Sequence, residues 1–148
     1  MRIVRMVLVG LMLSSVIHAS ICVAEIVSIK APKANIRSGP GTRYKILWSV
    51  GKFFPLKVLE RKGKWYRVRD FEGDGGWVYR KATSKIPAVV VKVRQANIRS
   101  GPGTQYQVDF FAERGTAFQL IKQVGNWIQI RHLDGDVGWI FRSLVWGR

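Results

Sequence analysis

The sequence predicts an all-β fold in which two tandem copies of a small β-barrel follow an N-terminal signal peptide. Three observations carry this prediction. The first two dozen residues differ in composition from the rest, a nine-residue segment recurs letter for letter, and short alternating runs lie between glycine-rich turns. Alternation of apolar and polar residues with a period of two is the pattern of a strand that is buried on one face.

Residues 1–24 have the composition of a secretory signal peptide. Two arginines precede an apolar run over residues 6–17, and small residues follow the run. This run is shorter than the roughly 20 residues that a membrane-spanning helix needs, so we expect cleavage rather than anchoring. The expected cleavage follows Ala24, with cleavage after Ala19 and lipidation of Cys22 as alternatives. The mature chain would be periplasmic or secreted, would have no transmembrane segment, and would contain no cysteine.

The rest of the chain contains an internal repeat with an offset of 62 residues. The segment Ala34–Thr42 reappears unchanged as residues 96–104, and the ungapped match extends over 60 positions, of which 20 are identical. The identities gather at turns and tryptophans, whereas the surface charges differ. Because a repeat of this kind indicates duplicated structural units, we divide the mature chain into two domains of one fold, over residues 25–84 and 87–148.

Each copy consists of short segments with the period of β-strands. Residues 65–69 alternate around Tyr66 and Val68, and residues 127–131 repeat the alternation. Glycine-rich turns separate such runs every eight to twelve residues, a spacing that is typical of a small barrel or sandwich. Gly63 is placed where a hairpin must reverse between two strands.

The repeated Ser-Gly-Pro-Gly-Thr element predicts a type II turn. Pro40 would occupy the second turn position, and Gly41 would supply the positive φ that the third position requires. The same assignment applies to Pro102 and Gly103 in the second copy.

The chain is strongly basic, with a formal net charge of +16. Residues 25–86 contain 15 basic and 5 acidic side chains, whereas residues 87–148 contain 8 and 4. An excess of this size favours association with anionic lipid, lipopolysaccharide phosphates or acidic wall polymers, although it would also keep an exported protein soluble. We do not expect nucleic acid as a partner, because export removes the protein from the cytoplasm.

A multi-part signature runs from Asn-Ile-Arg-Ser-Gly-Pro-Gly-Thr at residues 35–42 through residues 44–48 and 63–69 to Gly76-Trp77-Val78. This signature resembles the bacterial SH3-like domain, especially the variant that occurs as tandem copies in exported proteins of Gram-negative bacteria. The resemblance implies two strongly bent SH3-like barrels of about five to seven strands each, closed by short 3₁₀ turns near Lys81 and Ser143. It also implies binding of cell-wall peptides or of other proteins.

The mature chain offers little support for catalysis. His132 is its one histidine, and no cysteine is present to act with it as a nucleophile. The carboxylates around Gly73 and Gly135 fit hairpin turns better than a calcium site, because too few oxygen ligands accompany them. We therefore expect no enzyme activity, no cofactor and no metal.

Aromatic side chains are the candidates for a ligand-binding groove. Trp65, Trp77, Trp127 and Trp139 occupy matched positions in the two copies, and we assign them mainly to packing. The groove candidates are Tyr44, Trp48, Tyr66, Tyr79, Tyr106, Phe110, Phe141 and Trp146. The basic residues expected to attract an acidic ligand to the first copy are Lys45, Lys52, Lys62, Lys64 and Arg67.

Together these features predict a non-catalytic periplasmic binding module that recognises peptidoglycan peptides or a cell-wall-remodelling protein. Two alternatives stay open. The chain could connect two envelope proteins through its two barrels, or its basic first copy could associate with anionic lipid or lipopolysaccharide.

Overall fold

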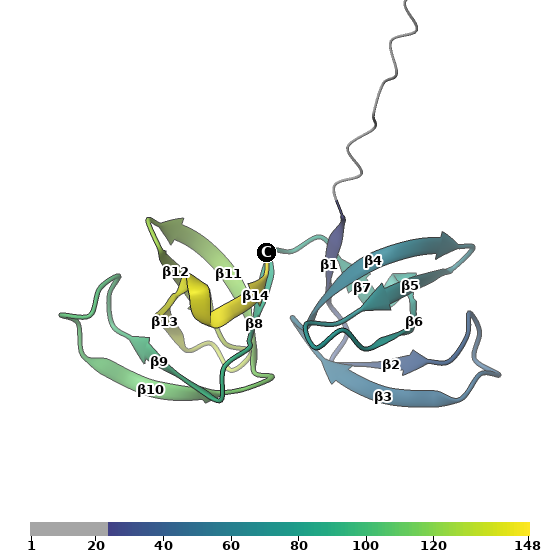
Figure 1. Ribbon diagram of the computed structural model, residues 1–148, viewed down its shortest axis with the longest axis horizontal. Helices are drawn as coiled ribbons and strands as arrows, with labels where there is room; N and C mark the ends of the chain where they lie inside the picture. Colours follow the sequence, from purple (N-terminus) through teal and green to yellow (C-terminus); the bar gives the residue numbers. More distant parts are fainter. Residues whose placement is uncertain (1–23) are drawn as a thin grey trace, which may run out of the picture.

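The computed structural model describes residues 24–148 as two barrels joined by a short connection (Figure 1). The expected signal peptide, apart from Ala24, lies outside the described residues. The first module contains β1 (Ile26–Ile29), β2 (Lys33–Arg37), β3 (Ile46–Gly51), β4 (Pro55–Lys62), β5 (Trp65–Arg69), β6 (Gly75–Tyr79), η1 (Arg80–Ala82) and β7 (Thr83–Ser84). The second module contains β8 (Ala88–Val91), β9 (Gln95–Arg99), β10 (Val108–Glu113), β11 (Ala117–Val124), β12 (Trp127–Arg131), β13 (Val137–Phe141), η2 (Arg142–Leu144) and β14 (Val145–Gly147).

The two modules have the same topology. Each forms one seven-stranded antiparallel sheet, in the order β3-β2-β6-β5-β4-β1-β7 and β10-β9-β13-β12-β11-β8-β14. The 3₁₀ turns expected near Lys81 and Ser143 are present as η1 and η2. The prediction of an all-β fold with two small barrels is therefore confirmed.

Alternation along the strands builds each core. On β5, Tyr66 and Val68 point into the first core, whereas the alternate residues Trp65, Arg67 and Arg69 face outward. The equivalent residues Ile128 and Ile130 on β12 are completely buried in the second core. Each barrel therefore has its own apolar interior, and the side chains available to a ligand are those of the opposite strand face.

A β-bulge explains how the second module accepts Asp109 within an apolar run. The pairing between β9 and β10 shifts between Val108 and Phe110, so Asp109 has no residue opposite it. Leu47 takes the matching place between β2 and β3. Because both bulge residues are exposed, an acid at this position replaces no core residue.

The expected type II turns are wrong. Neither Gly41 nor Gly103 has a positive φ. The N–H of Gly41 instead donates to the carbonyl of Gly39 at 3.0 Å, which closes a three-residue γ-turn around Pro40. The N–H of Gly103 donates in the same way to Gly101 at 2.9 Å. Because the φ of proline suits the centre of this tighter turn, the glycine that follows needs no positive φ.

The connection between the modules is tied to both of them. The Ser28 hydroxyl donates to the carbonyl of Ile86 at 2.7 Å, and the N–H of Leu120 donates to the carbonyl of Pro87 at 2.9 Å. Ser28 belongs to β1 and Leu120 to β11. The segment between the barrels is thus held by hydrogen bonds at either end.

The modules also pack directly against each other. All four residues of β8 are completely buried, but only Val89 and Val91 belong to the second core. β8 and β14 both contact β4 of the first module. A Cβ added to Gly147 would lie 3.0 Å from the Pro55 ring, which shows how closely β14 approaches β4. The barrels therefore share an apolar contact.

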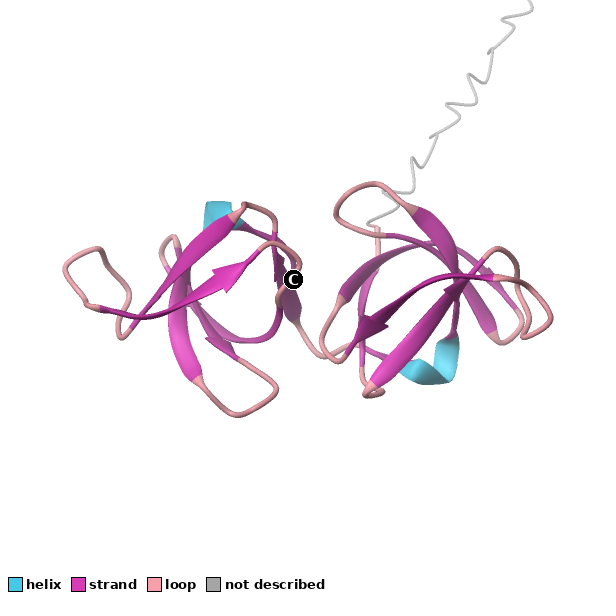
Figure 2. Cartoon of the chain, turned by 90° about the horizontal axis from the view of Figure 1, so that it is seen from below, coloured by secondary structure: helices cyan, strands magenta, loops and turns pink. Residues whose placement is uncertain are grey.

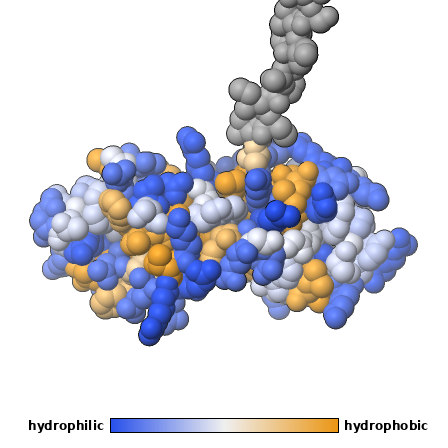
Figure 3. Space-filling model, viewed as in Figure 1, coloured by the Kyte–Doolittle hydropathy of each residue, from blue (hydrophilic) through white to orange (hydrophobic). Residues whose placement is uncertain are grey.

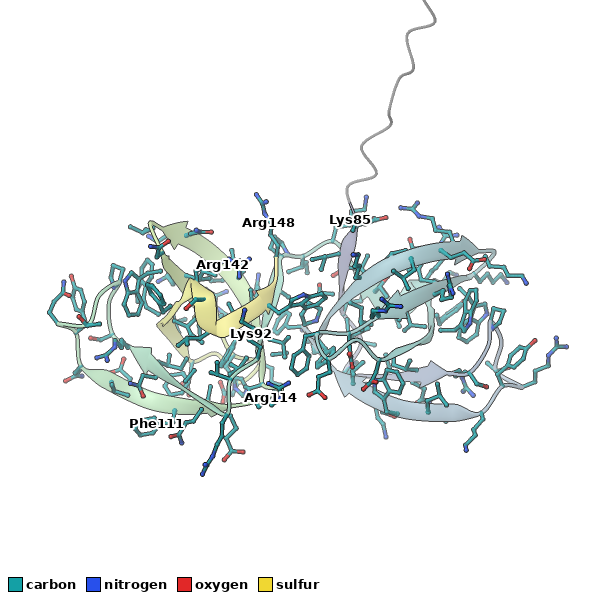
Figure 4. All side chains as sticks on the ribbon, in the orientation of Figure 1. Lys85, Lys92, Phe111, Arg114, Arg142 and Arg148 are labelled. Carbon is teal, nitrogen blue, oxygen red and sulfur yellow. The ribbon has the colours of Figure 1, made fainter. Side chains whose placement is uncertain are left out.

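A polar contact reinforces this packing. Arg114 extends from the second module toward the first (Figure 4). Its Nε lies 3.2 Å from Oε1 of Glu72, and its guanidinium lies 5.0 Å from the centre of the Phe71 ring.

With the modules arranged in this way, the 3₁₀ turns η1 and η2 lie on opposite sides of the molecule (Figure 2).

Candidate ligand-binding grooves

Each module has an open groove at the same place in its fold. The first groove, of about 500 Å³, lies between Trp65, Tyr79 and the Gly41-Thr42 loop. The second groove, of about 610 Å³, lies between Trp127, Phe141 and the Gly103-Thr104 loop. Nine of the eleven positions that line the first groove recur, 62 residues later, in the lining of the second. The duplication has therefore preserved a hollow as well as a barrel.

An aromatic pair forms one wall of each groove. Trp65 and Tyr79 are direct partners across β5 and β6, and their ring centres lie 5.6 Å apart. Trp127 and Phe141 are partners across β12 and β13, with ring centres 5.3 Å apart. Directly opposed aromatic residues stabilise an antiparallel pair and hold each other in one orientation. Each wall is consequently an ordered apolar surface that the barrel does not bury.

The repeated signature loop forms the facing wall. Ile36 is completely buried, so the neighbouring residues Asn35 and Arg37 project to the outside of β2, into the first groove. Nη1 of Arg37 donates to the carbonyls of Thr42 at 3.0 Å and Tyr44 at 2.9 Å. These hydrogen bonds tie the loop to β2 and fix the shape of the wall.

The same construction recurs in the second module. Nη1 of Arg99 donates to the carbonyls of Thr104 at 3.2 Å and Tyr106 at 2.8 Å. The role of the Asn-Ile-Arg sequence is thus to anchor the strand through isoleucine and the loop through arginine.

Glycine is required in this loop before the proline rather than after it. A Cβ on Gly39 would lie 2.5 Å from the Tyr44 ring, and a Cβ on Gly101 would lie 2.4 Å from the Tyr106 ring. Both distances are far below van der Waals contact. Tyr44 and Tyr106 therefore cover the loop by packing on a backbone that carries no side chain.

The two grooves differ in charge. Lys33 and Lys64 line the first groove, whereas Gln95 and Asn126 occupy the matching positions of the second module. Tyr79 also offers a hydroxyl where Phe141 has none. On the face seen in Figure 3, both modules carry apolar patches within a largely hydrophilic exterior. Arg37 and Arg99 line the two grooves at matching positions, so a ligand of the first groove would meet two more cations than a ligand of the second.

The structure distributes the aromatic candidates over several environments. Tyr79 and Phe141 line the grooves, and Tyr44 and Tyr106 cover the adjoining loops. The others lie elsewhere: Tyr66 is buried in the first core, Trp48 and Phe110 pack partly buried against their cores, and Trp146 is half-buried on β14.

The basic candidates are also dispersed. Lys64 lines the first groove, whereas Lys45 and Lys62 are exposed outside it. Lys52 lies over the Phe53 ring, with Nζ 5.2 Å from the ring centre. Arg67 pairs with Glu60 on β4, with Nε 3.1 Å from Oε2. Of the five, Lys64 is the residue that the fold places beside the aromatic wall.

Sequence reasoning missed the groove roles of Trp65 and Trp127, which it assigned mainly to packing. The signal was available, because Tyr66 and Val68 point inward on β5 and the alternation therefore turns Trp65 outward. It also missed Lys33, whose place in the groove depends on the pairing of strands that are distant in sequence.

In the first module, the loop before β3 contains one tyrosine whose pKa is shifted by a neighbouring arginine. Arg43 donates to the Tyr44 hydroxyl at 3.2 Å, and this hydrogen bond lowers the pKa of Tyr44 from its ordinary value.

Residues 24–148 contain no group of three histidine, cysteine, aspartate or glutamate side chains that could hold a metal ion. Within the same residues, no helix has the length and apolar character needed to cross a membrane.

Fold and grooves together define a class of protein, namely tandem small-barrel binding modules. The family model described as "Bacterial SH3 domain" matches residues 30–85 and 92–147. The chain therefore belongs to the bacterial SH3 domain family, with two copies of the domain.

Two proteins similar to this chain are named as amidases. A Bacillus subtilis (strain 168) protein, YrvJ, named as a candidate N-acetylmuramoyl-L-alanine amidase, is 28% identical over 128 residues, which are 79% of this chain and 24% of that protein. A candidate cell wall amidase, LytH of Staphylococcus epidermidis (strain ATCC 12228), is 37% identical over 46 residues, 30% of this chain and 16% of that protein. The chain thus spans about a quarter or less of these relatives.

A likeness to a solved structure is weaker. The solved structure "Endolysin LysPBC5 CBD" is 16% identical, with a TM-score of 0.34, and the match covers 84% of this chain and 93% of that one.

Proposed function

We propose that this protein is a non-catalytic binding protein of the cell envelope that recognises peptidoglycan peptides through its two grooves. The observation that carries the proposal is the conserved construction of the grooves within this one chain. Both modules keep an outward aromatic pair and a loop fixed by arginine, although their surfaces have otherwise diverged. An ordered apolar wall opposite a polar backbone loop suits an extended peptide, whose backbone can lie along the groove.

The similarity to named wall amidases supports the same assignment. It covers 79% of this chain but only 24% of YrvJ, so the shared part is a minor portion of that enzyme. The signal peptide predicted over residues 1–24 would deliver the mature chain to the compartment that contains peptidoglycan.

Retention on purified peptidoglycan sacculi tests the proposal. The wild-type protein should co-sediment with sacculi at moderate salt, and the double variant Trp65→Ala/Trp127→Ala should lose most of this retention. Phe111→Ala is the matched control, because Phe111 is a 60% exposed aromatic residue outside both grooves (Figure 4). Failure of the wild-type protein to sediment would remove the peptidoglycan assignment. Capture of a single envelope protein by crosslinking in cells, without wall fragments, would favour the adaptor alternative.

A further inference from the structure

The first module has a second hollow, which we call the basic pocket, at the end of the barrel beside η1. This pocket, of about 390 Å³, is lined by Lys64, Arg80, Lys81 and Lys85 around Tyr66. The hydroxyl-bearing residues Thr83 and Ser84 complete the polar part of its lining. Four cationic side chains from three parts of the chain thus converge on one concave surface.

Few acidic side chains offset this charge. Arg61 and Arg80 both lie over the Tyr66 ring, at 5.6 and 5.3 Å from its centre, so a fifth cation borders the pocket. Glu25 is the nearby acid: it forms an ion pair with Arg61, and its Oε1 lies 3.4 Å from Nζ of Lys85. Lys64 and Lys81 belong to no ion pair found among the described residues. Their charges remain available to an anionic ligand.

The second module lacks most of these groups. Asn126, Ser143 and Gly147 occupy the places of Lys64, Lys81 and Lys85. The arginine itself is kept: Arg80 donates to the carbonyl of Gly63 at 2.7 Å, and Arg142 donates to the carbonyls of Val145 at 3.2 Å and Gly147 at 3.3 Å. Apolar residues also replace the hydroxyl groups, at Ile128, Val145 and Trp146. Six of the eight positions that line the pocket differ in the second copy, so the shared fold does not require this feature.

The basic pocket adjoins the first groove. Lys64 lines both hollows, and η1 separates them, with Ala82 on the groove side and Arg80 and Lys81 on the pocket side. A ligand lying along the aromatic wall would therefore reach the cations at its end. A concave site beside a groove fits a charged group on a chain better than it fits the flat surface of a membrane.

We propose that the basic pocket binds the carboxylates of an acidic peptide whose backbone lies in the first groove, and so sets the direction of that peptide. This inference rests on the proposed function, because it takes the groove as the peptide site. The second groove, which has no such pocket, would accept peptide without a requirement for carboxylates.

Binding of a soluble muropeptide with free carboxylates, compared with the same muropeptide after amidation of its carboxylates, tests the inference. The variant Lys64→Asn/Lys81→Ser introduces the residues of the second module and so is compatible with the fold. Lys45→Gln/Lys57→Gln removes the same charge, also with second-module residues, from positions outside groove and pocket.

By isothermal titration at low salt, the wild type and the Lys45/Lys57 control should bind the free form about tenfold more tightly than the amidated form, because several charge-assisted hydrogen bonds are lost on amidation. Lys64→Asn/Lys81→Ser should abolish this preference, so that the free and the amidated forms bind with equal affinity.

Equal affinity of the wild type for the two forms would overturn the pocket while leaving the groove assignment intact. Equal losses in the two double variants would also overturn it, since the attraction would then be diffuse. Tighter binding to anionic phospholipid vesicles than to the free muropeptide would assign the cations to a membrane instead. No binding of either muropeptide, together with no retention on sacculi, would remove the proposed function and the pocket with it.

Discussion

The Gly-Pro-Gly loop allows a sharp test of how the grooves are built, by alanine substitution on either side of the proline. At Gly39, a methyl group would lie 2.5 Å from the Tyr44 ring, so the ring must leave its position. At Gly41, the nearest atom of that ring would be 3.3 Å away, and the φ is not positive, so a small adjustment suffices. The sequence does not distinguish the two glycines, whereas the structure does.

The expected magnitudes follow from these contacts. Forcing a methyl group into a packed position costs about 1–3 kcal/mol, and for a domain of this size about 1 kcal/mol lowers the melting temperature by roughly 4–8 °C. Gly39→Ala should therefore destabilise the first module by about 1–3 kcal/mol, whereas Gly41→Ala should cost less than about 1 kcal/mol. Because Tyr44 covers the loop that lines the first groove, Gly39→Ala should also weaken retention on sacculi.

Urea unfolding followed by tryptophan fluorescence measures the stability change, and co-sedimentation measures the binding change. The matching pair Gly101→Ala and Gly103→Ala gives an independent comparison in the second module, where a Cβ on Gly101 would meet Tyr106 at 2.4 Å. At Gly103 the obstructing group is the flexible Gln105 side chain, which can move away. The reasoning would be refuted if the substitution after the proline were the more damaging one in both modules.

Three further predictions concern the module contact, the strained turn and the acid side of the stability profile. Gly147→Val should separate the modules, because Gly147 has a φ of +114° and lies against Ala88 and Pro55. Small-angle scattering should then show a larger radius of gyration for the variant. An unchanged scattering curve would contradict the contact between the modules. Phe53 is the one non-glycine residue with a positive φ (+68°) within residues 24–148, and Phe53→Gly should relieve that strain. The variant should nevertheless be less stable by about 1–3 kcal/mol in urea unfolding, because burial of the ring contributes more than the strain costs. A more stable variant would contradict this. Burial favours protonation of Glu25, but the hydrogen bond from Arg61 and the nearby ammonium group of Lys85 outweigh burial and lower the pKa of Glu25 from 4.5. The stabilisation that the Glu25 carboxylate provides is therefore present at neutral pH and lost as pH falls below about 4.5. Between about pH 5 and 3, Glu25→Gln should lose less free energy of unfolding than the wild type, by under about 1 kcal/mol. Parallel plots of stability against pH for the two proteins would contradict the ion pair.

The fold was predictable because its determinants are local or repeated. Alternation around Tyr66 and Val68 identifies a strand within five residues, and the 62-residue offset shows that every element occurs twice. The groove was harder to predict because residues from three strands and a loop line it. Lys33 and Trp65 line the same groove only because β2 and β5 both pair with β6. The turn at Pro40 was predicted incorrectly because Pro-Gly fits both a type II turn and the γ-turn that the structure contains.

The arrangement of the modules bears on what two grooves can achieve together. All four residues of β8 are buried between the second core and the first module, and the connection is hydrogen-bonded at both ends. The grooves end at η1 and η2, which lie on opposite sides of the molecule (Figure 2). Two sites on one chain increase overall affinity only when geometry allows both to be occupied by the same target.

A short soluble peptide cannot reach around the molecule to occupy both grooves, whereas a meshwork of peptides presents targets on both sides. The protein should therefore bind a single muropeptide weakly and retain intact sacculi more strongly. The difference should disappear when either Trp65 or Trp127 is replaced by alanine, because one remaining groove gains nothing from a second target. If either single variant were retained as well as the wild type, the grooves would act independently and the contact at β8 would serve stability alone.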